Sequence, residues 1–165
     1  MGYGYCGRVL HVDLTKGTIE VEKPPESFYR QYLGGTAMGV YYLLKHMVPG
    51  ADPLGPDNIL TVFVSVPTGA PVSGLSRVTV NARSPLTGAV GDAQAGGFWP
   101  VRLKAAGYDG IVFTGQAAKP VYLWVDDDRV ELRDASHLWG KVTGEVEDML
   151  RDELGDKKIE VMQIG

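Results

Sequence analysis

The sequence contains very little cysteine, since Cys6 is the single residue of that type among 165. One cysteine cannot form an internal disulfide, and it cannot build a thiolate metal site. No motif that would lower the pKa of its thiol surrounds Cys6. We therefore interpret Cys6 as a small buried apolar residue rather than a nucleophile.

Long apolar runs and an excess of positive charge are also absent from the sequence. No apolar stretch approaches the roughly 20 residues that a membrane-spanning helix needs, and no basic segment followed by an apolar one indicates a signal peptide. The formal net charge is −4, which does not favour a nucleic-acid surface. We expect neither a membrane nor a nucleic-acid partner, and a cytoplasmic location.

Turn-forming residues, in contrast, are abundant, with 22 glycines and 10 prolines. They fall between segments of regular hydrophobic periodicity, which indicates many short elements rather than disorder. A chain of this length is sufficient for one domain with a sizeable core. We therefore expect residues 1–165 to form a single α+β domain with many strands and a few helices.

The periodicity and the turn residues predict most of the elements. Strands are expected at 5–14, 18–22, 58–66, 77–83, 109–114, 121–125, 129–133 and 158–164, and helices at 27–33, 37–47, 98–106 and 144–154. The first two strands form one expected hairpin, and strands 121–125 and 129–133 form another. Thr36 and Thr143 are suitable N-caps. The nearly continuous apolar run at 58–66 predicts a strand buried on both faces.

The stretch from residue 77 to 99, RVTVNARSPLTGAVGDAQAGGFW, has the most distinctive organisation. Its first part alternates polar and apolar residues, which predicts a half-buried strand with Arg77 and Asn81 on the polar face. Gly96 and Gly97 then precede a predicted helix, where backbone N–H groups can approach an anion that Arg77 can also reach. On spacing alone, an ordinary strand, turn and helix is the commoner explanation of this pattern.

Other polar residues give weaker indications of a site. His11 has no second histidine or carboxylate at ligand spacing, so a metal-binding role is not favoured. Three successive aspartates at 126–128 occupy a predicted hairpin tip, where their side chains diverge, and a solvated turn explains them better than a cation site. His137 has no identifiable charge partner, and packing beside Trp139 is the better interpretation. The residues alone therefore indicate no catalytic or metal-ligating set.

Eight short segments occur in an order that resembles the N-terminal domain of the aldehyde ferredoxin oxidoreductase family, the tungsten–pterin enzymes. They are 7–14 (GRVLHVDL), 32–35 (YLGG), 52–58 (DPLGPDN), 84–88 (SPLTG), 95–98 (AGGF), 103–110 (LKAAGYDG), 119–122 (KPVY) and 133–141 (RDASHLWGK). Each segment is weak alone, but together and in this order they are highly specific. The resemblance implies two related β-sheets that form a cofactor-binding base with a few flanking helices.

The resemblance also implies a cofactor and the residues that bind it. In the family, tungsten or sometimes molybdenum is held by dithiolenes of two pterin molecules lying on the base. Arg77 matches the family's arginine that binds a pterin phosphate, and Ala95, Gly96 and Gly97 match backbone positions that approach the pterin. Gln94 stands where the family often has asparagine, near a magnesium ion that bridges the pterin phosphates. A contact between the backbone carbonyl of residue 94 and this ion would not depend on which side chain is present.

Other parts of the family's machinery have no counterpart in this sequence. The cysteines that ligate the family's [4Fe–4S] cluster lie further along the chain, and Cys6 matches none of them. A second set of pterin-binding residues and the acid–base groups beside the metal also lie downstream. The sequence stops where the expected strand 158–164 finishes. We therefore expect the N-terminal pterin-binding domain of a longer protein, inactive without its cluster-binding domains.

The resemblance implies that the parent protein oxidises a small aldehyde to a carboxylic acid and passes electrons through its cluster to ferredoxin. Relatives with the same base reduce aromatic acyl-CoA thioesters or interconvert 2-hydroxy and 2-oxo acids, and these reactions stay open here. A stand-alone, non-catalytic module that binds a pterin or a partner subunit is a third hypothesis. The substrate, the choice between tungsten and molybdenum, and the oligomeric state, including a homodimer, are also left open.

Overall fold

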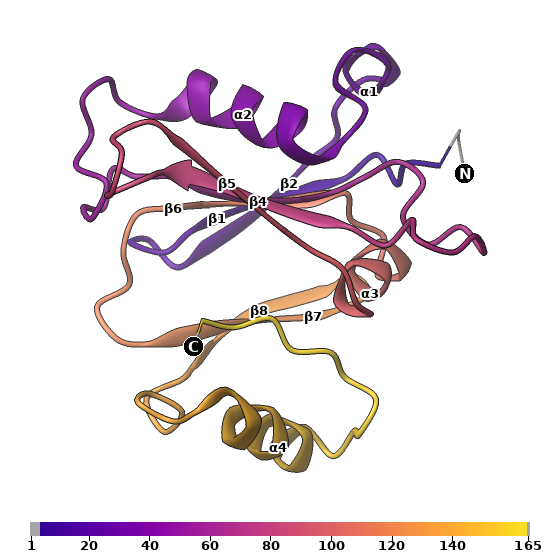
Figure 1. Cartoon of the computed structure of the whole chain (residues 1–165). Helices are drawn as coiled ribbons and strands as arrows, with labels where there is room; N and C mark the ends of the chain where they lie inside the picture. The colour runs from indigo at the N-terminus through magenta and orange to yellow at the C-terminus, as the bar shows by residue number, and fades with distance from the viewer. Residues whose placement is uncertain (1–3, 165) are drawn as a thin grey trace.

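The computed structural model describes residues 4–164, which form two β-sheets and four helices (Figure 1). The strands are β1 (Val9–Asp13), β2 (Thr18–Glu22), β3 (Leu60–Val64), β4 (Val78–Arg83), β5 (Val90–Ala95), β6 (Gly110–Thr114), β7 (Val121–Asp126) and β8 (Arg129–Asp134). The helices are α1 (Glu26–Tyr32), α2 (Gly35–His46), α3 (Trp99–Ala105) and α4 (Thr143–Leu154). The expected α+β fold with two sheets is confirmed.

The larger sheet has six strands in the order β2-β1-β6-β3-β4-β5. Its one parallel pair is β1 with β6, and the other neighbours within residues 4–164 are antiparallel. The smaller sheet is the antiparallel hairpin of β7 and β8, so both predicted hairpins are confirmed. In this order β5 lies at one edge of the larger sheet, and one of its sides has no strand neighbour among the described residues.

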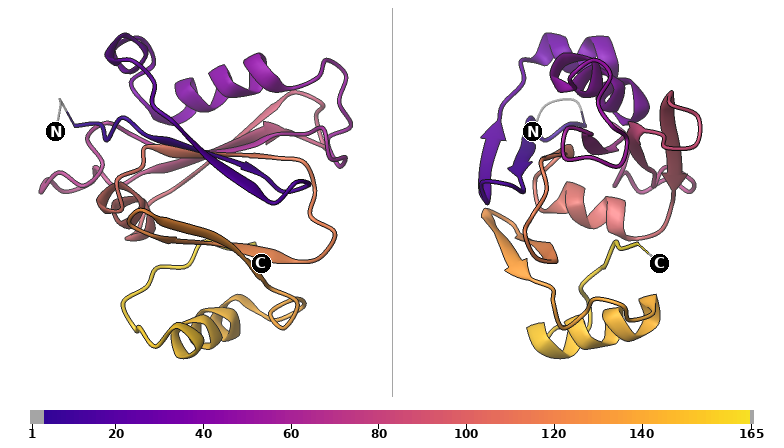
Figure 2. Two further views of the ribbon diagram at one scale, coloured as in Figure 1. Left: turned by 180° about the vertical axis from the view of Figure 1, so that it is seen from behind. Right: turned by 90° about the vertical axis from the view of Figure 1, so that its left-hand side faces the viewer.

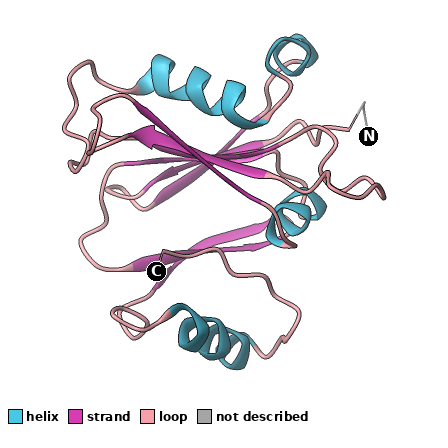
Figure 3. Cartoon of the chain, viewed as in Figure 1, coloured by secondary structure: helices cyan, strands magenta, loops and turns pink. Residues whose placement is uncertain are grey.

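The elements are stacked in layers, with α1 and α2 on one face of the larger sheet and the β7–β8 hairpin below the other (Figure 1, Figure 3). Viewed from the side, α4 lies beyond the hairpin, in the layer farthest from α2 (Figure 2). Neighbouring residues on the central strands point into different cores, as Phe63 packs with α1 and α2 while Val62 packs with α3. The predicted burial of this strand on both faces is confirmed, because four of the five residues of β3 are buried.

The polar face of β4 is not exposed as the alternation predicted. Thr79 is 5% exposed and Asn81 is fully buried, because α2 packs across β3 and β4. Gly39 makes this close approach possible, since a Cβ there would collide with Asn81 Oδ1 and would lie 2.8 Å from Thr61 Oγ1. The predicted strand is present, but α2 covers its polar side. The local sequence pattern does not reveal this packing, because it depends on the close approach of Gly39 to β3 and β4.

Two further expectations from the sequence are corrected by the structure. Residues 158–164 form no strand, because no described strand lies beside them to complete a ladder. Ile159 and Val161 pack instead against the core beneath α4, and Gly165 lies outside the described residues. Helix α2 begins one residue before the predicted N-cap Thr36, and α4 begins at the predicted N-cap Thr143 itself. Neither helix has a side-chain hydrogen bond that caps its N-terminus.

A buried carboxylate ties the N-terminal segment to the rest of the fold. Asp109 is 2% exposed and pairs with Lys104 Nζ at 2.7 Å. It also accepts hydrogen bonds from the backbone N–H groups of Cys6 at 2.9 Å and Gly7 at 2.7 Å. Partial burial raises the pKa of the Cys6 thiol, which agrees with its interpretation as a packing residue rather than a nucleophile.

Replacing Asp109 by asparagine should lower the free energy of unfolding by about 3 kcal/mol, because the Lys104 ammonium, whose side chain is only 11% exposed, loses its counter-charge. Urea denaturation of the variant and of the unchanged protein measures this difference. Asp13→Asn is the matched control, since the Asp13–Lys16 pair spans 2.9 Å on an exposed turn and such pairs contribute little. Equal effects of the two substitutions would contradict the role assigned to Asp109.

Candidate cofactor-binding site

The predicted site residues lie together where β4 begins and β5 ends. In the antiparallel ladder Val78 pairs with Ala95, and Thr79 pairs with Gln94. Arg77 immediately precedes this ladder, and the two glycines at 96 and 97 immediately follow it. The structure therefore brings residue 77 and residues 94–97 to one end of two neighbouring strands, although they are separated along the chain.

Short contacts define the position of Arg77 at this end of the ladder. A Cβ added to Gly96 would lie 2.8 Å from Arg77 Nη1, so the guanidinium lies directly against the Gly96 backbone. Ser76 Oγ donates a hydrogen bond to the carbonyl oxygen of Gly97 at 2.5 Å, which joins the two chain segments beyond the ladder. Arg77 is exposed, and no ion pair within residues 4–164 involves it. Its charge is available to an anion.

The surface beside Arg77 is an exposed strand edge built from small side chains. Gln94, Ala95 and Gly97 are exposed, and Gly96 is half-buried. Gly97 has a φ of 91°, a left-handed conformation that a residue with a Cβ adopts only at a cost. Backbone groups at 95–97 can therefore be approached closely by a flat or charged ligand.

A polar network that the sequence did not reveal adjoins this edge. Asp92 Oδ2 accepts hydrogen bonds from Thr36 Oγ1 at 2.5 Å and from Asn81 Nδ2 at 3.1 Å, while Oδ1 accepts from Gln94 Nε2 at 3.3 Å. The hydrogen bond from Thr36 is the main cause that holds the pKa of Asp92 below its usual value. Asp92 is therefore ionised at neutral pH. The sequence pattern indicates a helix cap at Thr36 and an exposed position for Asn81, and neither interpretation points to this network.

Residues 4–164 contain no group of three or more histidine, cysteine, aspartate or glutamate side chains that could hold a metal ion. His11 Nε2 lies 2.6 Å from Glu22 Oε2, and His137 Nε2 lies 2.8 Å from Glu153 Oε2. The partner of His137 comes from α4, which is why the local sequence did not show it. In the hairpin tip Asp128 pairs with Arg8 at 2.8 Å.

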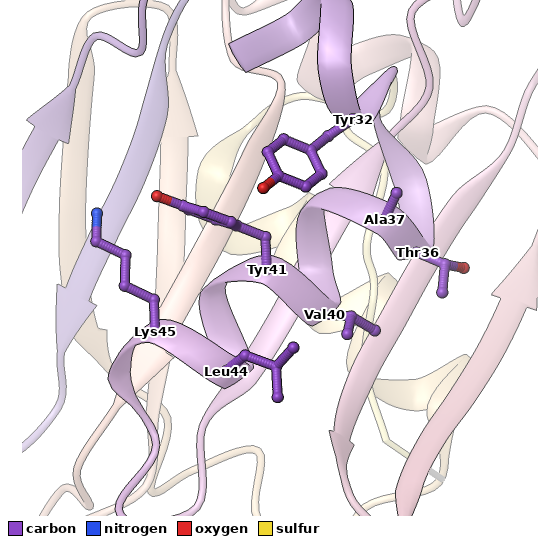
Figure 4. Close-up of a pocket in the computed structure, with 7 residues that line it drawn as sticks. All are labelled: Tyr32, Thr36, Ala37, Val40, Tyr41, Leu44 and Lys45. Carbon is purple, nitrogen blue, oxygen red and sulfur yellow. The ribbon is translucent and has the colours of Figure 1, made fainter.

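An apolar groove of about 720 Å³ lies along α2. It is lined by Tyr32, Thr36, Ala37, Val40, Tyr41, Leu44 and Lys45 (Figure 4). Thr36 borders it, but the hydroxyl points away from Tyr32 and Tyr41 in this view. None of the predicted cofactor-binding residues contributes to the groove. Among the described helices, none has the length and apolar character that crossing a bilayer requires.

Comparison with known proteins shows which family this chain belongs to. Residues 9–165 match the family model described as aldehyde ferredoxin oxidoreductase, N-terminal domain. The chain belongs to the aldehyde ferredoxin oxidoreductase family. The match covers both sheets and all four described helices, including the Arg77 end of β4 and the 94–97 segment.

Curated relatives in this family are considerably longer than this chain. The tungsten-containing aldehyde ferredoxin oxidoreductase of Pyrococcus abyssi is 45% identical over 166 residues, which cover 99% of this chain and 27% of that protein. The aliphatic sulfonate oxidoreductase, WOR-like subunit, of Pyrococcus furiosus is 36% identical over 141 residues, or 84% of this chain and 22% of that protein. The chain thus spans about a quarter of the length of these relatives.

A solved structure shows the same fold. The active site complex BamBC of benzoyl coenzyme A reductase, in complex with 1,5-dienoyl-CoA, superposes with a TM-score of 0.92 at 39% identity. The match covers 96% of this chain and 24% of the chain in that complex. A chain of that complex therefore has the architecture described here.

The geometry of the two glycines predicts different results for their substitution. Gly96→Ala should change the thermal midpoint little, because the long Arg77 side chain can move away from the new methyl group. Gly97→Ala should destabilise by about 1 to 2 kcal/mol, since alanine is strained at positive φ. Thermal unfolding of both variants measures the difference, and a larger loss for Gly96→Ala would show that Arg77 is rigidly held.

Proposed function

We propose that this chain is the N-terminal pterin-binding domain of a tungsten-dependent oxidoreductase that oxidises aldehydes to carboxylic acids, with ferredoxin as electron acceptor. The observation that carries the proposal is the Arg77 guanidinium, which lies against the Gly96 backbone without a carboxylate partner within residues 4–164. The names of the relatives that are about 45% identical support tungsten, aldehydes and ferredoxin. The domain would be one part of a longer protein.

The residues at this edge fit a phosphorylated, flat cofactor. Arg77 would pair with a pterin phosphate, because a guanidinium matches two phosphate oxygens at once. The small side chains at 95–97 leave the backbone open to the face of a pterin. Gln94 would lie beside a magnesium ion that is bound together with the cofactor. The metal would be held by the cofactor rather than by side chains of this chain.

The cofactor and the remaining domains would supply the chemistry. When bound, the tungsten centre supplies oxygen transfer and two-electron oxidation of the aldehyde carbon. This chain's residues would bind the cofactor at the Arg77 end of β4 and β5 and orient it. The [4Fe–4S] cluster, the acid–base groups and the second set of pterin contacts would come from the remainder of the parent protein. Molybdenum in place of tungsten would require the same contacts from this domain.

A second function is favoured by one particular finding. The benzoyl coenzyme A reductase complex shares this fold with a TM-score of 0.92 at 39% identity, so a reductive acyl-CoA reaction uses the same kind of base. The substrate determinants would lie in the rest of the protein. Assay of the intact enzyme with aldehydes, aromatic acyl-CoA thioesters and 2-oxo acids distinguishes the reactions, and turnover of the thioester alone would replace the aldehyde assignment.

Replacing Arg77 by alanine in the full-length enzyme should lower tungsten and pterin content, because the pterin phosphate loses its charged partner. Metal analysis and pterin quantification per mole of purified protein measure the loss. A hydrogen bond to a charged group contributes about 1.5 to 3 kcal/mol, so the affinity for the cofactor should decrease by roughly 10- to 150-fold.

The matched control for this experiment is Arg151→Ala. Arg151 lies on α4 and pairs with Glu147, in the layer farthest from α2 (Figure 2). The Arg151→Ala substitution also removes one positive charge but leaves the strand edge unchanged, so the cofactor content should be unchanged. Equal content in the unchanged protein and in both variants would remove Arg77 from the site.

A further inference from the structure

Thr68 is a buried polar residue in a loop that is otherwise half-buried or exposed. It is 4% exposed, whereas the remaining residues from 65 to 77 are all more exposed. A buried hydroxyl is normally hydrogen-bonded, and the partners of this hydroxyl come from both ends of the loop. The function proposed above assigns it no role.

The Thr68 hydroxyl lies where β3 and β4 separate. The ladder between these strands ends with the pair Val64 and Val78, and Ser65 and Arg77 are the next residues on the two sides. Thr68 Oγ1 accepts a hydrogen bond from the Ser65 N–H at 3.2 Å and donates to the Arg77 carbonyl oxygen at 3.4 Å. The hydroxyl therefore bridges the two chain segments one step beyond the ladder.

Two further contacts use the rest of the hydrogen-bonding capacity of this hydroxyl. Ser65 Oγ lies 2.9 Å from Thr68 Oγ1, and the Leu75 carbonyl oxygen lies 3.3 Å from it. With Ser65 Oγ as the donor, Thr68 accepts two hydrogen bonds and shares its own hydrogen between the carbonyls of Leu75 and Arg77. One side chain thus holds both the start of the loop and the end that leads into Arg77.

The support that Thr68 gives is anchored in the interior of the protein. The Ser65 carbonyl oxygen accepts hydrogen bonds from the Thr68 N–H at 3.1 Å and from Lys104 Nζ at 3.4 Å. Lys104 in turn pairs with the buried Asp109 at 2.7 Å. The backbone of Arg77 is therefore connected, through Thr68 and Ser65, to a buried ion pair.

On the other side, the segment that carries Arg77 is held by β5. Ser76 Oγ donates to the Gly97 carbonyl oxygen at 2.5 Å, and Val78 pairs with Ala95. Arg77 is thus supported from β5 by its two neighbours in the chain, and from the end of β3 by the Thr68 hydroxyl.

We propose that Thr68 is a positioning residue, whose hydroxyl fixes the Arg77 backbone so that the guanidinium stays against Gly96 and meets the cofactor phosphate. This inference rests on the function proposed above. Arg77 is exposed, so the place of its guanidinium depends strongly on the backbone that carries it. A two-point contact between guanidinium and phosphate requires a particular direction, and binding groups must be held within about 0.5 Å of the productive geometry.

Thr68→Val in the full-length enzyme tests the inference, because it replaces the hydroxyl by a methyl group of similar size. Tungsten and pterin per mole of purified protein, from cells grown with limiting tungsten, should decrease about 5-fold, as expected for the loss of one hydrogen bond. Thr68→Ser keeps the hydroxyl and should restore the cofactor content of the unchanged protein. Unchanged content in Thr68→Val, or an equal loss in Thr68→Ser, would overturn the proposal.

A double-variant comparison with Arg77 separates positioning from a general loss of stability. In the Arg77→Ala protein no guanidinium remains to be positioned, so adding Thr68→Val should lower the cofactor content no further. The comparison is made at a tungsten concentration at which Arg77→Ala still has a measurable content. The same fold-loss with and without Arg77 would show that Thr68 acts only through stability, and the positioning role would be wrong.

Thr61→Val is the matched control. Thr61 is fully buried on β3, and its hydroxyl donates to the Asn81 carbonyl oxygen at 3.4 Å, three ladder positions from the pair Val64 and Val78. This substitution removes the same group between the same two strands, so it should lower the thermal midpoint and leave the cofactor content unchanged. A loss of cofactor as large as in Thr68→Val would contradict the proposal.

Two further results keep the outcome interpretable. If Thr68→Val does not accumulate as folded protein, Thr68→Ala removes the same hydroxyl from a smaller side chain, and unchanged cofactor content in it overturns the proposal equally. If Arg77→Ala lowers the cofactor content but neither Thr68 variant does, only the positioning role is wrong. If Arg77→Ala leaves the cofactor content unchanged, the proposed function is wrong as well.

Discussion

The close packing of α2 on β3 and β4 is the constraint on which the candidate site depends. It requires glycine at position 39, because Asn81 and Thr61 occupy the space that a side chain would need. This contact buries the polar face of β4 and places Thr36 within hydrogen-bonding distance of Asp92 on β5. The edge of the sheet, which has no strand neighbour on its far side within residues 4–164, is thereby fixed from the interior of the protein.

The fold explains why an open strand edge can serve as a binding surface. Residues 77 and 94–97 meet because β4 and β5 are antiparallel neighbours, so their alignment follows from the ladder rather than from a flexible loop. An exposed arginine and small side chains then provide charge and access at one place. On the proposed function, such a surface would contact only one side of a large cofactor, and the chain spans about a quarter of its relatives' length.

Local patterns in the sequence predicted most elements, because each depends on periodicity and turn residues close together in the chain. The run at 58–66 indicated a strand buried on both faces, and the 77–83 alternation indicated β4. The strand and glycine pattern indicated Arg77, Gly96 and Gly97 as an anion site, and the resemblance added Gln94 and Ala95 and named the ligand. What could not be predicted depends on contacts distant in sequence: the burial of Asn81 beneath α2, the bond between Thr36 and Asp92, and the pairing of His137 with Glu153. Residues 158–164 were predicted to form a strand but do not, because a strand needs a neighbouring strand to hydrogen-bond with as well as a suitable sequence pattern.

The central claim is that the Arg77 end of the β4–β5 ladder binds the phosphate of a pterin cofactor. The most direct measurement is a crystal structure of the intact, cofactor-loaded protein. The account predicts a phosphate oxygen within about 2.7–2.9 Å of the Arg77 guanidinium and the pterin against the backbone of residues 95–97. A cofactor bound with its phosphates on another surface, and with Arg77 in contact only with protein or solvent, would contradict it.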